Sequence, residues 1–172
     1  MKVLALDIST TSTGIAVLED DKLIHLEVIA PGSRNVYTRI EKITERIEEI
    51  FKEYKPQVIV AEEPEPAFVK NNINVYRKLT IAHGCIQIML NHYKKEMELV
   101  NASHWRKNCG IKTGRGITRA MLKPKDIEMA KELYPDYAAE IGNNDDKADA
   151  ILVGHSWFVE NTLREQKEYN WE

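Results

Sequence analysis

Acidic residues directly follow two short apolar runs, where solubility does not require a charge. Asp7 follows the apolar residues 3–6, and Glu62 and Glu63 follow the apolar residues 58–61. A carboxylate at the end of a buried strand costs desolvation energy unless it is paired or binds a cation. Because side chains alternate between the faces of a strand, only one glutamate can point where Asp7 points, and Glu62 still belongs to the strand. The alternative is that these acids cap a turn or are solvated where a loop begins.

A third acidic group opens a helical pattern near the end of the chain. Asp146 and Asp149 lie three residues apart, so one face of a helix would carry both, and Asp145 with Asp149 would share a face nearly as well. Acids in a first helical turn usually favour the helix dipole, so Asp145 and Asp146 alone indicate little. Asp149 is different, because it lies among the apolar residues 148–152 where the helix is expected to be buried.

Two strand-end acids and a helical pair make a cluster of hard oxygen ligands without histidine or thiolate. Such a cluster is typical of Mg²⁺ or Mn²⁺ sites and not of zinc sites. Two such ions serve phosphoryl chemistry by activating water and by stabilising the leaving oxygen. The two cysteines lie far apart without CxxC spacing, and the five histidines share no ligand spacing. The sequence therefore predicts a carboxylate metal centre.

Positive charge is concentrated in one segment, although the formal net charge is −3. Residues 106–125 contain no acid and seven basic residues, namely Arg106, Lys107, Lys112, Arg115, Arg119, Lys123 and Lys125. The glycines at 110, 114 and 116 would let the backbone approach phosphate groups there. We expect this segment to bind nucleic acid, and the alternative is a solvated surface loop. Trp105, beside it, would either stack on a base or lie in the core.

The elements that must position these residues follow from the hydrophobic pattern. The order of three strands, helix, strand, helix, strand and further helices predicts an α/β fold: a mixed five-stranded sheet, its first three strands antiparallel, with helices on both faces. The length fits one domain, residues 1–172. The expected strands are 2–7, 14–18, 23–29, 58–61 and 99–100, and the expected helices are 37–55, 71–93, 103–108, 125–134 and 145–161.

The predicted helix Asn71–Tyr93 is apolar over an unusually wide arc. One stripe runs from Tyr76 to Tyr93, and Ile81, Cys85 and Ile88 extend it sideways. A helix of this kind is buried against more than one partner. Either it is clamped between the sheet and another helix, or it forms the seam of a dimer.

Three segments together resemble a known family. LALDISTTSTGIAV, KPQVIVAEEPEP and NDDKADAILVG, in this order, resemble the three acidic motifs of RuvC-type Holliday junction resolvases, nucleases of the RNase H-like superfamily. There an Asp ends the first strand, a Glu ends the fourth strand six residues after a proline, and an Asp-x-x-Asp pair opens the last catalytic helix. The spacing from Pro56 favours Glu62 over Glu63, and the Asp-x-x-Asp spacing favours Asp146 over Asp145. The resemblance therefore implies the catalytic and metal-binding acids Asp7, Glu62, Asp146 and Asp149.

The same resemblance implies partners and cofactors. It implies two Mg²⁺ ions in each active site, with Mn²⁺ also supporting activity, and a homodimer through the helix around Asn71–Tyr93. It places basic residues beside the scissile phosphate, and Lys107 and Lys125 fall near those positions. Resolvases of this type also carry an aromatic residue shortly after the strand-four glutamate. Here only Phe68 could serve as that DNA contact, which puts the selectivity for junctions in question.

We therefore expect paired hydrolysis of DNA phosphodiesters at four-way or other branched junctions. One alternative is a nuclease of the same fold that acts on RNA or on an RNA–DNA hybrid, because fold does not fix substrate. Another is a non-catalytic module that binds nucleic acid. The segment LDISTTSTG also resembles the phosphate loop of sugar kinases and other actin-like ATPases, but those need two such domains, and 172 residues are too few.

The chain carries no sign of a membrane or secretory segment. No stretch approaches the roughly 20 apolar residues that cross a bilayer. The first residues, MKVLALDIST, place an acid where a signal peptide needs an apolar core. We expect a cytoplasmic protein, associated with the nucleoid or present in a virus-infected cell.

Overall fold

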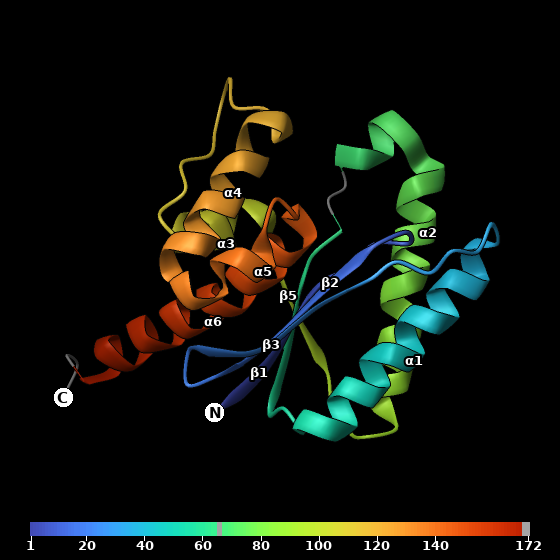
Figure 1. The fold of residues 1–172 in the computed structure, drawn as a ribbon, viewed down its shortest axis with the longest axis horizontal. Coiled ribbons are helices and arrows are strands. Elements are labelled where there is room, and N and C mark those ends of the chain that lie inside the picture. The colour runs from blue at the N-terminus through green and yellow to red at the C-terminus, as the bar shows by residue number, and fades with distance from the viewer. Residues whose placement is uncertain (65–66, 170–172) are drawn as a thin grey trace.

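A five-stranded sheet forms the centre of the molecule (Figure 1). The computed structural model describes the backbone of residues 1–64 and 67–169, and the side chains of 1–64 and 72–164. The strands lie in the order β3-β2-β1-β4-β5. Their bounds are β1 Lys2–Asp7, β2 Thr13–Glu19, β3 Lys22–Ile29, β4 Val58–Glu62 and β5 Met97–Val100. Strands β1, β2 and β3 are antiparallel, and β4 and β5 continue the sheet in parallel to β1. The predicted mixed sheet is thus confirmed.

Helices cover both faces of this sheet, as Figure 1 shows. One face carries α1 and α2, with bounds Val36–Tyr54 and Ala67–Asn91. The other carries the C-terminal helices: α3 Ala102–Asn108, α4 Arg119–Leu133, α5 Ala138–Ile141 and α6 Asp145–Tyr169, with a short 3₁₀ turn at Pro135–Tyr137 before α5. Each side of the sheet therefore has its own apolar core.

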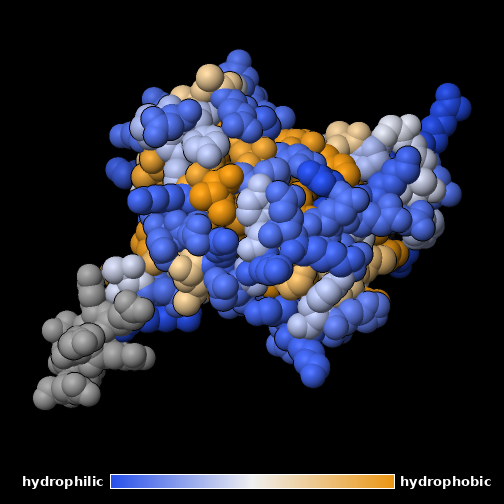
Figure 2. Space-filling model, turned by 60° about the horizontal axis from the view of Figure 1, so that its bottom comes forward, coloured by the Kyte–Doolittle hydropathy of each residue, from blue (hydrophilic) through white to orange (hydrophobic). Residues whose placement is uncertain are grey.

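The central strands supply both cores through the alternation of their side chains. Val3 and Ala5 of β1 pack with the apolar residues of α6, whereas Leu4 and Leu6 pack with those of α1 and α2. All four residues are fully buried. A strand buried on both faces needs a continuous apolar run, which is why residues 3–6 contain no polar side chain. Outside these cores the surface is mainly hydrophilic, with small apolar patches, on the face that Figure 2 shows.

Three helices differ from their predicted extents. Helix α4 begins at Arg119, six residues before the expected start at Lys125, although Pro124 lies inside it. Proline lacks the backbone N–H and usually ends or begins a helix, which is why the sequence pattern favoured the later start. Helix α2 begins at Ala67 and contains a break at Asn72, whose φ and ψ angles are −161° and 84°.

Helix α6 continues to Tyr169, eight residues beyond its expected end at Asn161. The short helix α5 and the 3₁₀ turn before it were not predicted. The other strands and helices lie within a few residues of their predicted positions.

The wide apolar arc of α2 is only half covered. Ala82, Ile86 and Leu90 are buried against the sheet and α1. Ile81 and Ile88 on the same helix are 40% and 62% exposed. The described residues therefore cover the apolar stripe of α2, but they leave Ile81 and Ile88 beside it exposed. None of the helices among the described residues combines the length and apolar character that crossing a membrane requires.

Candidate active site

The parallel pairing of β1 and β4 brings Asp7 and Glu62 together. Leu6 pairs with Ala61, so the next residue of each strand lies at the same edge of the sheet. Val3, Ala5 and Val60 pack on the α6 side of the sheet. Asp7 lies two residues after Ala5 on β1, and Glu62 lies two residues after Val60 on β4. Both carboxylates therefore point to the same face. The expectation that Glu62, and not Glu63, shares the direction of Asp7 agrees with this register.

Helix α6 begins against the start of β2, beside Asp7. Gly14 pairs with Asp7 across β1 and β2. A Cβ atom at Gly14 would lie 1.9 Å from the carbonyl oxygen of Asp146 and 3.2 Å from the Cβ atom of Ala150. The missing side chain is thus what lets the first turn of α6, with Asp146 and Asp149, approach the strand that carries Asp7.

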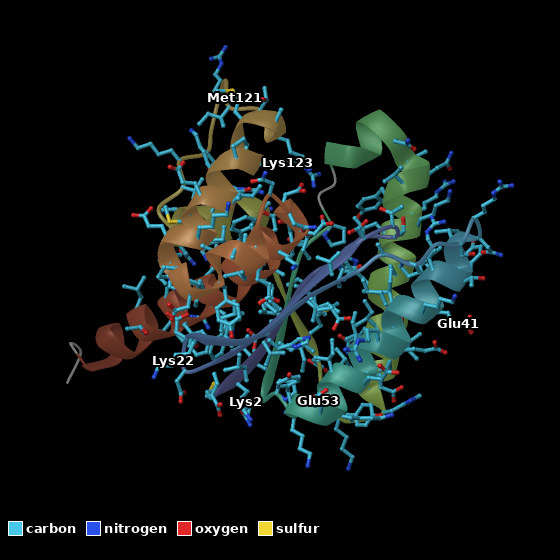
Figure 3. All side chains as sticks on the ribbon, viewed as in Figure 1. Lys2, Lys22, Glu41, Glu53, Met121 and Lys123 are labelled. Atoms are coloured by element: carbon cyan, nitrogen blue, oxygen red, sulfur yellow. The ribbon has the colours of Figure 1, made fainter. Side chains whose placement is uncertain are left out.

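The carboxylates border a cavity of about 200 Å³ at this edge of the sheet. Four acids line it, namely Asp7, Glu62, Asp145 and Asp146, and so do the basic residues Arg119 and Lys123 of α4. The remaining lining residues come from the loop after β1, from Glu63 and Pro64, and from Val75, Tyr76, Leu79 and His83 of α2. Figure 3 shows Lys123 on the side of α4 that faces α2. Asp149 lies beneath the cavity and is 5% exposed.

Burial makes the ionised carboxylates of this cluster unfavourable. The pKa of Asp7 is raised well above its ordinary value, first by burial and then by the charges of Glu62 and Asp146, against the opposing charge of Arg119. The pKa of Asp149 is also raised, by burial and then by the charge of Asp7, with further negative charge from Asp126 and Glu62. Strongly shifted acids in a cavity are typical of functional sites. Such a cluster is stabilised by a bound cation.

Each carboxylate has a distinct set of protein partners. The indole Nε1 of Trp105 donates a hydrogen bond of 2.7 Å to Oε2 of Glu62. The hydroxyl of Ser12 donates to Oδ2 of Asp146, and Lys123 pairs with Asp145. Asp149 faces the guanidinium of Arg106, whose Nη2 lies 3.8 Å from its Oδ2. The other oxygen of Asp149, Oδ1, is buried and has no hydrogen-bond partner among the described residues.

The donor chemistry of this cluster fits a hard divalent cation. All its ligand atoms are carboxylate oxygens, the atoms that Mg²⁺ and Mn²⁺ prefer. The unpaired, buried Oδ1 of Asp149 is a polar atom that an additional partner must satisfy. Within the described part of the chain no three such side chains yet converge to metal-binding distances.

The predicted basic residues divide into three groups. Arg119 and Lys123 line the acidic cavity. Lys107, Lys112, Arg115 and Lys125 are exposed but do not line it, so Lys107 and Lys125 are not beside the carboxylates as the resemblance implied. Arg106 is only 8% exposed and forms a buried ion pair of 2.9 Å with Asp126, a residue with no exposed surface. Its expected role as a DNA contact is therefore wrong, because the guanidinium faces the protein interior.

Three further residues belong to the predicted site, namely Asp145, Asp146 and Phe68. Asp146 accepts a hydrogen bond from Ser12, whereas Asp145 is paired with Lys123, and the choice of Asp146 as the ligand stays a prediction. The pKa of Asp145 is itself lowered, against its burial, by the hydrogen bond and charge of Lys123. Phe68 lies on α2, but its side chain is outside the described residues, so its DNA contact stays a prediction.

Sequence reasoning missed several contacts around the carboxylates of the site. Asp126 had no assigned role, and its partner Arg106 lies 20 residues away on another helix. His83 was placed in no site, yet it lines the cavity, with Nε2 3.1 Å from the carbonyl oxygen of Glu62. Trp105 was expected either in the core or on a base. It is fully buried in the core and also bonds Glu62. Each of these contacts joins residues 20 or more positions apart, so no local pattern in the sequence signals them.

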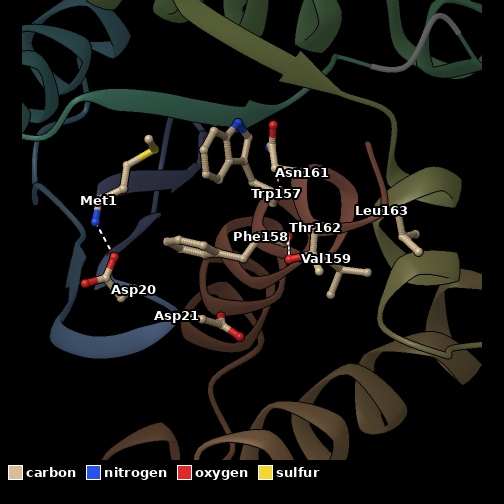
Figure 4. A pocket seen from close by; sticks show the side chains of 9 residues that line it. All are labelled: Met1, Asp20, Asp21, Trp157, Phe158, Val159, Asn161, Thr162 and Leu163. Carbon is tan, nitrogen blue, oxygen red and sulfur yellow. Dashed lines mark hydrogen bonds and ion pairs between the residues drawn. The ribbon is translucent and has the colours of Figure 1, made fainter. Parts of the chain in front are cut away.

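A larger hollow, of about 600 Å³, lies at the other end of the sheet (Figure 4). Its walls include Trp157, Phe158 and Leu163 of α6, and Met1 pairs there with Asp20 through its amino group. The nearby Asp21 is held by Tyr134 and His155. This hollow has few convergent polar groups, so we place the candidate active site at the carboxylate cavity and not here.

The strand order, the antiparallel start and the helices on both faces define an RNase H-like fold. At the level of sequence, no family model and no curated protein matches the chain. Solved structures do match it in fold, and Holliday junction resolvases are among them.

The chain is similar to Thermus thermophilus RuvC in complex with a Holliday junction substrate, with a TM-score of 0.75 and 17% identity over 94% of this chain and 96% of that one. It is also similar to the yeast mitochondrial Holliday junction resolvase Ydc2, with a TM-score of 0.65 and 15% identity over 97% and 82% of the two chains. The fowlpox virus resolvase bound to Holliday junction DNA has a TM-score of 0.57 and 19% identity over 95% and 99%. The predicted resemblance is thus confirmed for the fold.

Proposed function

We propose that this protein is a metal-dependent endonuclease that resolves four-way or other branched DNA junctions by paired phosphodiester hydrolysis. One observation carries the proposal: acids from β1, β4 and α6 converge at a cavity that two basic residues also line. A phosphodiester that enters this cavity would meet both the carboxylates and the side chains of Arg119 and Lys123. The fold shared with resolvases that are bound to junction DNA supports the choice of substrate.

Four carboxylates would hold the metal ions: Asp7, Glu62, Asp146 and Asp149. Two bound Mg²⁺ ions, or Mn²⁺ ions, would supply an activated water and neutralise charge on the reacting phosphate. The chain's own contribution is positioning. Arg119 and Lys123 would bind the phosphate, and the exposed Lys107, Lys112, Arg115 and Lys125 would bind the DNA backbone further away. Lys107 and Lys125 therefore act in DNA binding in this proposal, and not beside the scissile bond.

Paired cuts require two active sites, and α2 offers the surface for a homodimer. Ile81 and Ile88 on α2 and Tyr37 on α1 are large apolar side chains with 40%, 62% and 60% of their surface exposed. Tyr37 and Ile88 line a groove between α1 and α2. Its other lining residues include Cys85, Met89 and His92 of α2, and Glu41, Glu45 and Glu48 of α1. A second copy of the chain would bury these apolar residues about a two-fold axis, since a self-complementary patch is what a symmetric dimer requires.

The test is a cleavage assay on a four-way DNA junction with each strand end-labelled in turn. The purified protein is incubated with Mg²⁺, Mn²⁺ or EDTA, beside a linear duplex and an RNA–DNA hybrid. We expect symmetric, paired nicks in the junction that disappear in EDTA. An intact junction with a cut hybrid would instead assign the same acids to RNA removal. Junction binding without any cutting would favour a non-catalytic binding module.

A further inference from the structure

Two adjacent residues of α3 contact two different carboxylates of the candidate site. The indole of Trp105 donates its hydrogen bond to Glu62, at the end of β4. The guanidinium of Arg106 bonds both carboxylate oxygens of Asp126 and faces Asp149 of α6. The guanidinium carbon also lies 4.1 Å from the centre of the Trp105 ring, a distance typical of stacked cation–π pairs. The two side chains thus form one rigid unit.

The sheet places this unit behind the carboxylates. Val100 at the end of β5 pairs with Glu62 at the end of β4, and the backbone N–H of Glu63 donates to the carbonyl of Val100. Helix α3 begins directly afterwards, with the side chain of Asn101 accepting a hydrogen bond from the backbone N–H of Ser103. The turn from β5 into α3 therefore returns Trp105 to the neighbouring strand, where its fully buried ring reaches Glu62.

The contacts use specific oxygens of the two acids. Trp105 bonds Oε2 of Glu62, and Arg106 faces Oδ2 of Asp149 at 3.8 Å. Oδ1 of Asp149 is buried without a hydrogen-bond partner among the described residues. A buried acceptor inside an otherwise paired network indicates that a further partner belongs there. In this arrangement Oδ1 of Asp149 is open to an ion. Glu62 is held by the hydrogen bond from Trp105, and Oδ2 of Asp149 faces the charge of Arg106.

We propose that Trp105 and Arg106 are positioning residues of the metal centre: Trp105 fixes Glu62, and Arg106 fixes Asp149 through the Asp126 ion pair. This inference rests on the proposed metal-dependent function. Groups that orient metal ligands contribute strongly to affinity, and their loss typically costs about 10- to 100-fold in metal affinity or activity. Neither residue has to touch DNA or the reacting phosphate for this role.

Metal binding in the absence of DNA tests the proposal with a matched control. Trp105→Phe keeps an aromatic ring but loses the N–H that bonds Glu62. Trp157→Phe makes the same chemical change at a second indole, whose Nε1 donates to Oε2 of Glu98 at 2.9 Å, outside the carboxylate cavity. By calorimetric titration with Mn²⁺, we expect Trp105→Phe to raise the dissociation constant about 10-fold or more, and Trp157→Phe to leave it unchanged. Equal dissociation constants for wild type and Trp105→Phe would overturn the inference.

The metal dependence of cleavage gives a second readout. A lost positioning contact should shift the Mn²⁺ concentration for half-maximal cleavage upward, with most of the rate recovered at saturating Mn²⁺. A purely structural role would lower the rate by the same factor at every Mn²⁺ concentration. That result, too, would contradict the inference.

A third measurement keeps Trp105 intact, in case its replacement prevents folding. The chain has three tryptophans, so the double variant Trp157→Phe/Trp171→Phe retains Trp105 as its only indole. We expect Mn²⁺ to quench this fluorescence with the calorimetric dissociation constant, and Asp7→Asn to abolish the effect. Mn²⁺ binding without any change in Trp105 fluorescence would overturn the inference alone. A wild-type chain that binds no Mn²⁺ would overturn the proposed function with it.

Discussion

The backbone of Asp146 lies against Gly14, at a distance that leaves no room for a side chain between them. A Cβ atom at Gly14 would lie 1.9 Å from the Asp146 carbonyl oxygen, and 2.6 Å from the carbonyl carbon. Both obstacles are backbone atoms, which cannot rotate away as a side chain can. The packing of α6 on β2 therefore depends on glycine at this position, and so does the approach of α6 to Asp7.

Gly14→Ala should consequently displace the start of α6. Overpacking of this kind typically costs about 1–3 kcal/mol, so we expect a loss of that size in the free energy of unfolding measured in urea. Metal-dependent cleavage should fall further than stability does, because Asp146 moves with the helix. Gly32→Ala is the control, since a Cβ atom there meets nothing within 4 Å. Equal stability and activity of the two variants would show that α6 tolerates the shift.

Asp7→Asn separates the catalytic role of Asp7 from its effect on stability. The variant should lose junction cleavage by at least about 100-fold while it retains junction binding. In EDTA at neutral pH it should also be more stable than wild type, because the buried charge and its repulsion by Glu62 are removed. Cleavage rates and urea unfolding of the same preparations check both parts. A variant that cuts normally would show that the site is assigned wrongly.

The stability of the metal-free protein should fall as the pH rises. Burial, and the negative charges around Asp7 and Asp149, hold both pKa values above those of the unfolded chain, so the folded state binds more protons. The stabilisation by these protonated acids is complete below about pH 4, the unfolded value, and is lost as the pH rises through the folded values.

With Mn²⁺ present the trend should reverse, because metal ligands must be deprotonated. Thermal unfolding from pH 4 to pH 8, with EDTA or Mn²⁺, measures the difference. A shift by Mn²⁺ that is equal at every pH would contradict the carboxylate site.

Lys123→Gln tests the role of the basic residues that line the cavity. We expect weaker junction binding, with the slope of log affinity against log salt reduced by about 1, because one phosphate contact is lost. Lys22→Gln is the matched control, since Lys22 is exposed at the start of β3, away from the cavity (Figure 3). Fluorescence anisotropy with a labelled junction at several salt concentrations gives both slopes. If the two variants behave alike, Lys123 does not contact DNA.

Ile88→Glu tests the dimer surface on α2. Burial of an unpaired charge at the seam should raise the dimer dissociation constant by about 10-fold or more, and junction nicks should become unpaired. Leu163→Glu serves as the control, because Leu163 of α6 is 50% exposed and lies far from α2 in the fold. Sedimentation velocity over a concentration series measures the dimer dissociation constants of the two variants and of the wild type. A monomeric wild-type protein would rule out the proposed homodimer.

The convergence of the candidate acids was predictable because it follows local patterns. Residues 3–6 and 58–61 are apolar runs that end in acids, and parallel pairing places such ends at one edge of a sheet. The helical spacing of Asp146 and Asp149 likewise requires only the period of the α-helix. These signals are local, so one sequence is enough to find them.

The positions of the basic residues were harder to predict, because they depend on contacts between distant segments. Arg106 belongs to a run of positive charge that is typical of a surface, and only the packing of α3 on α4 shows that it is buried with Asp126. Pro124 concealed the true start of α4, and with it the position of Arg119 and Lys123 on one face toward the cavity. Long-range pairing of this kind leaves no periodic trace in the sequence.

The site draws its acids from the first strand of the sheet and from α6, the last helix of the chain. During synthesis the amino-terminal elements leave the ribosome first, and domains tend to fold in that order. A chain that has formed β1 to β5 but has not yet docked α6 would contain Asp7 and Glu62 without Asp146 or Asp149. Under the proposed function, a chain whose α6 is not docked would lack half of its metal ligands and would not cut the DNA around it.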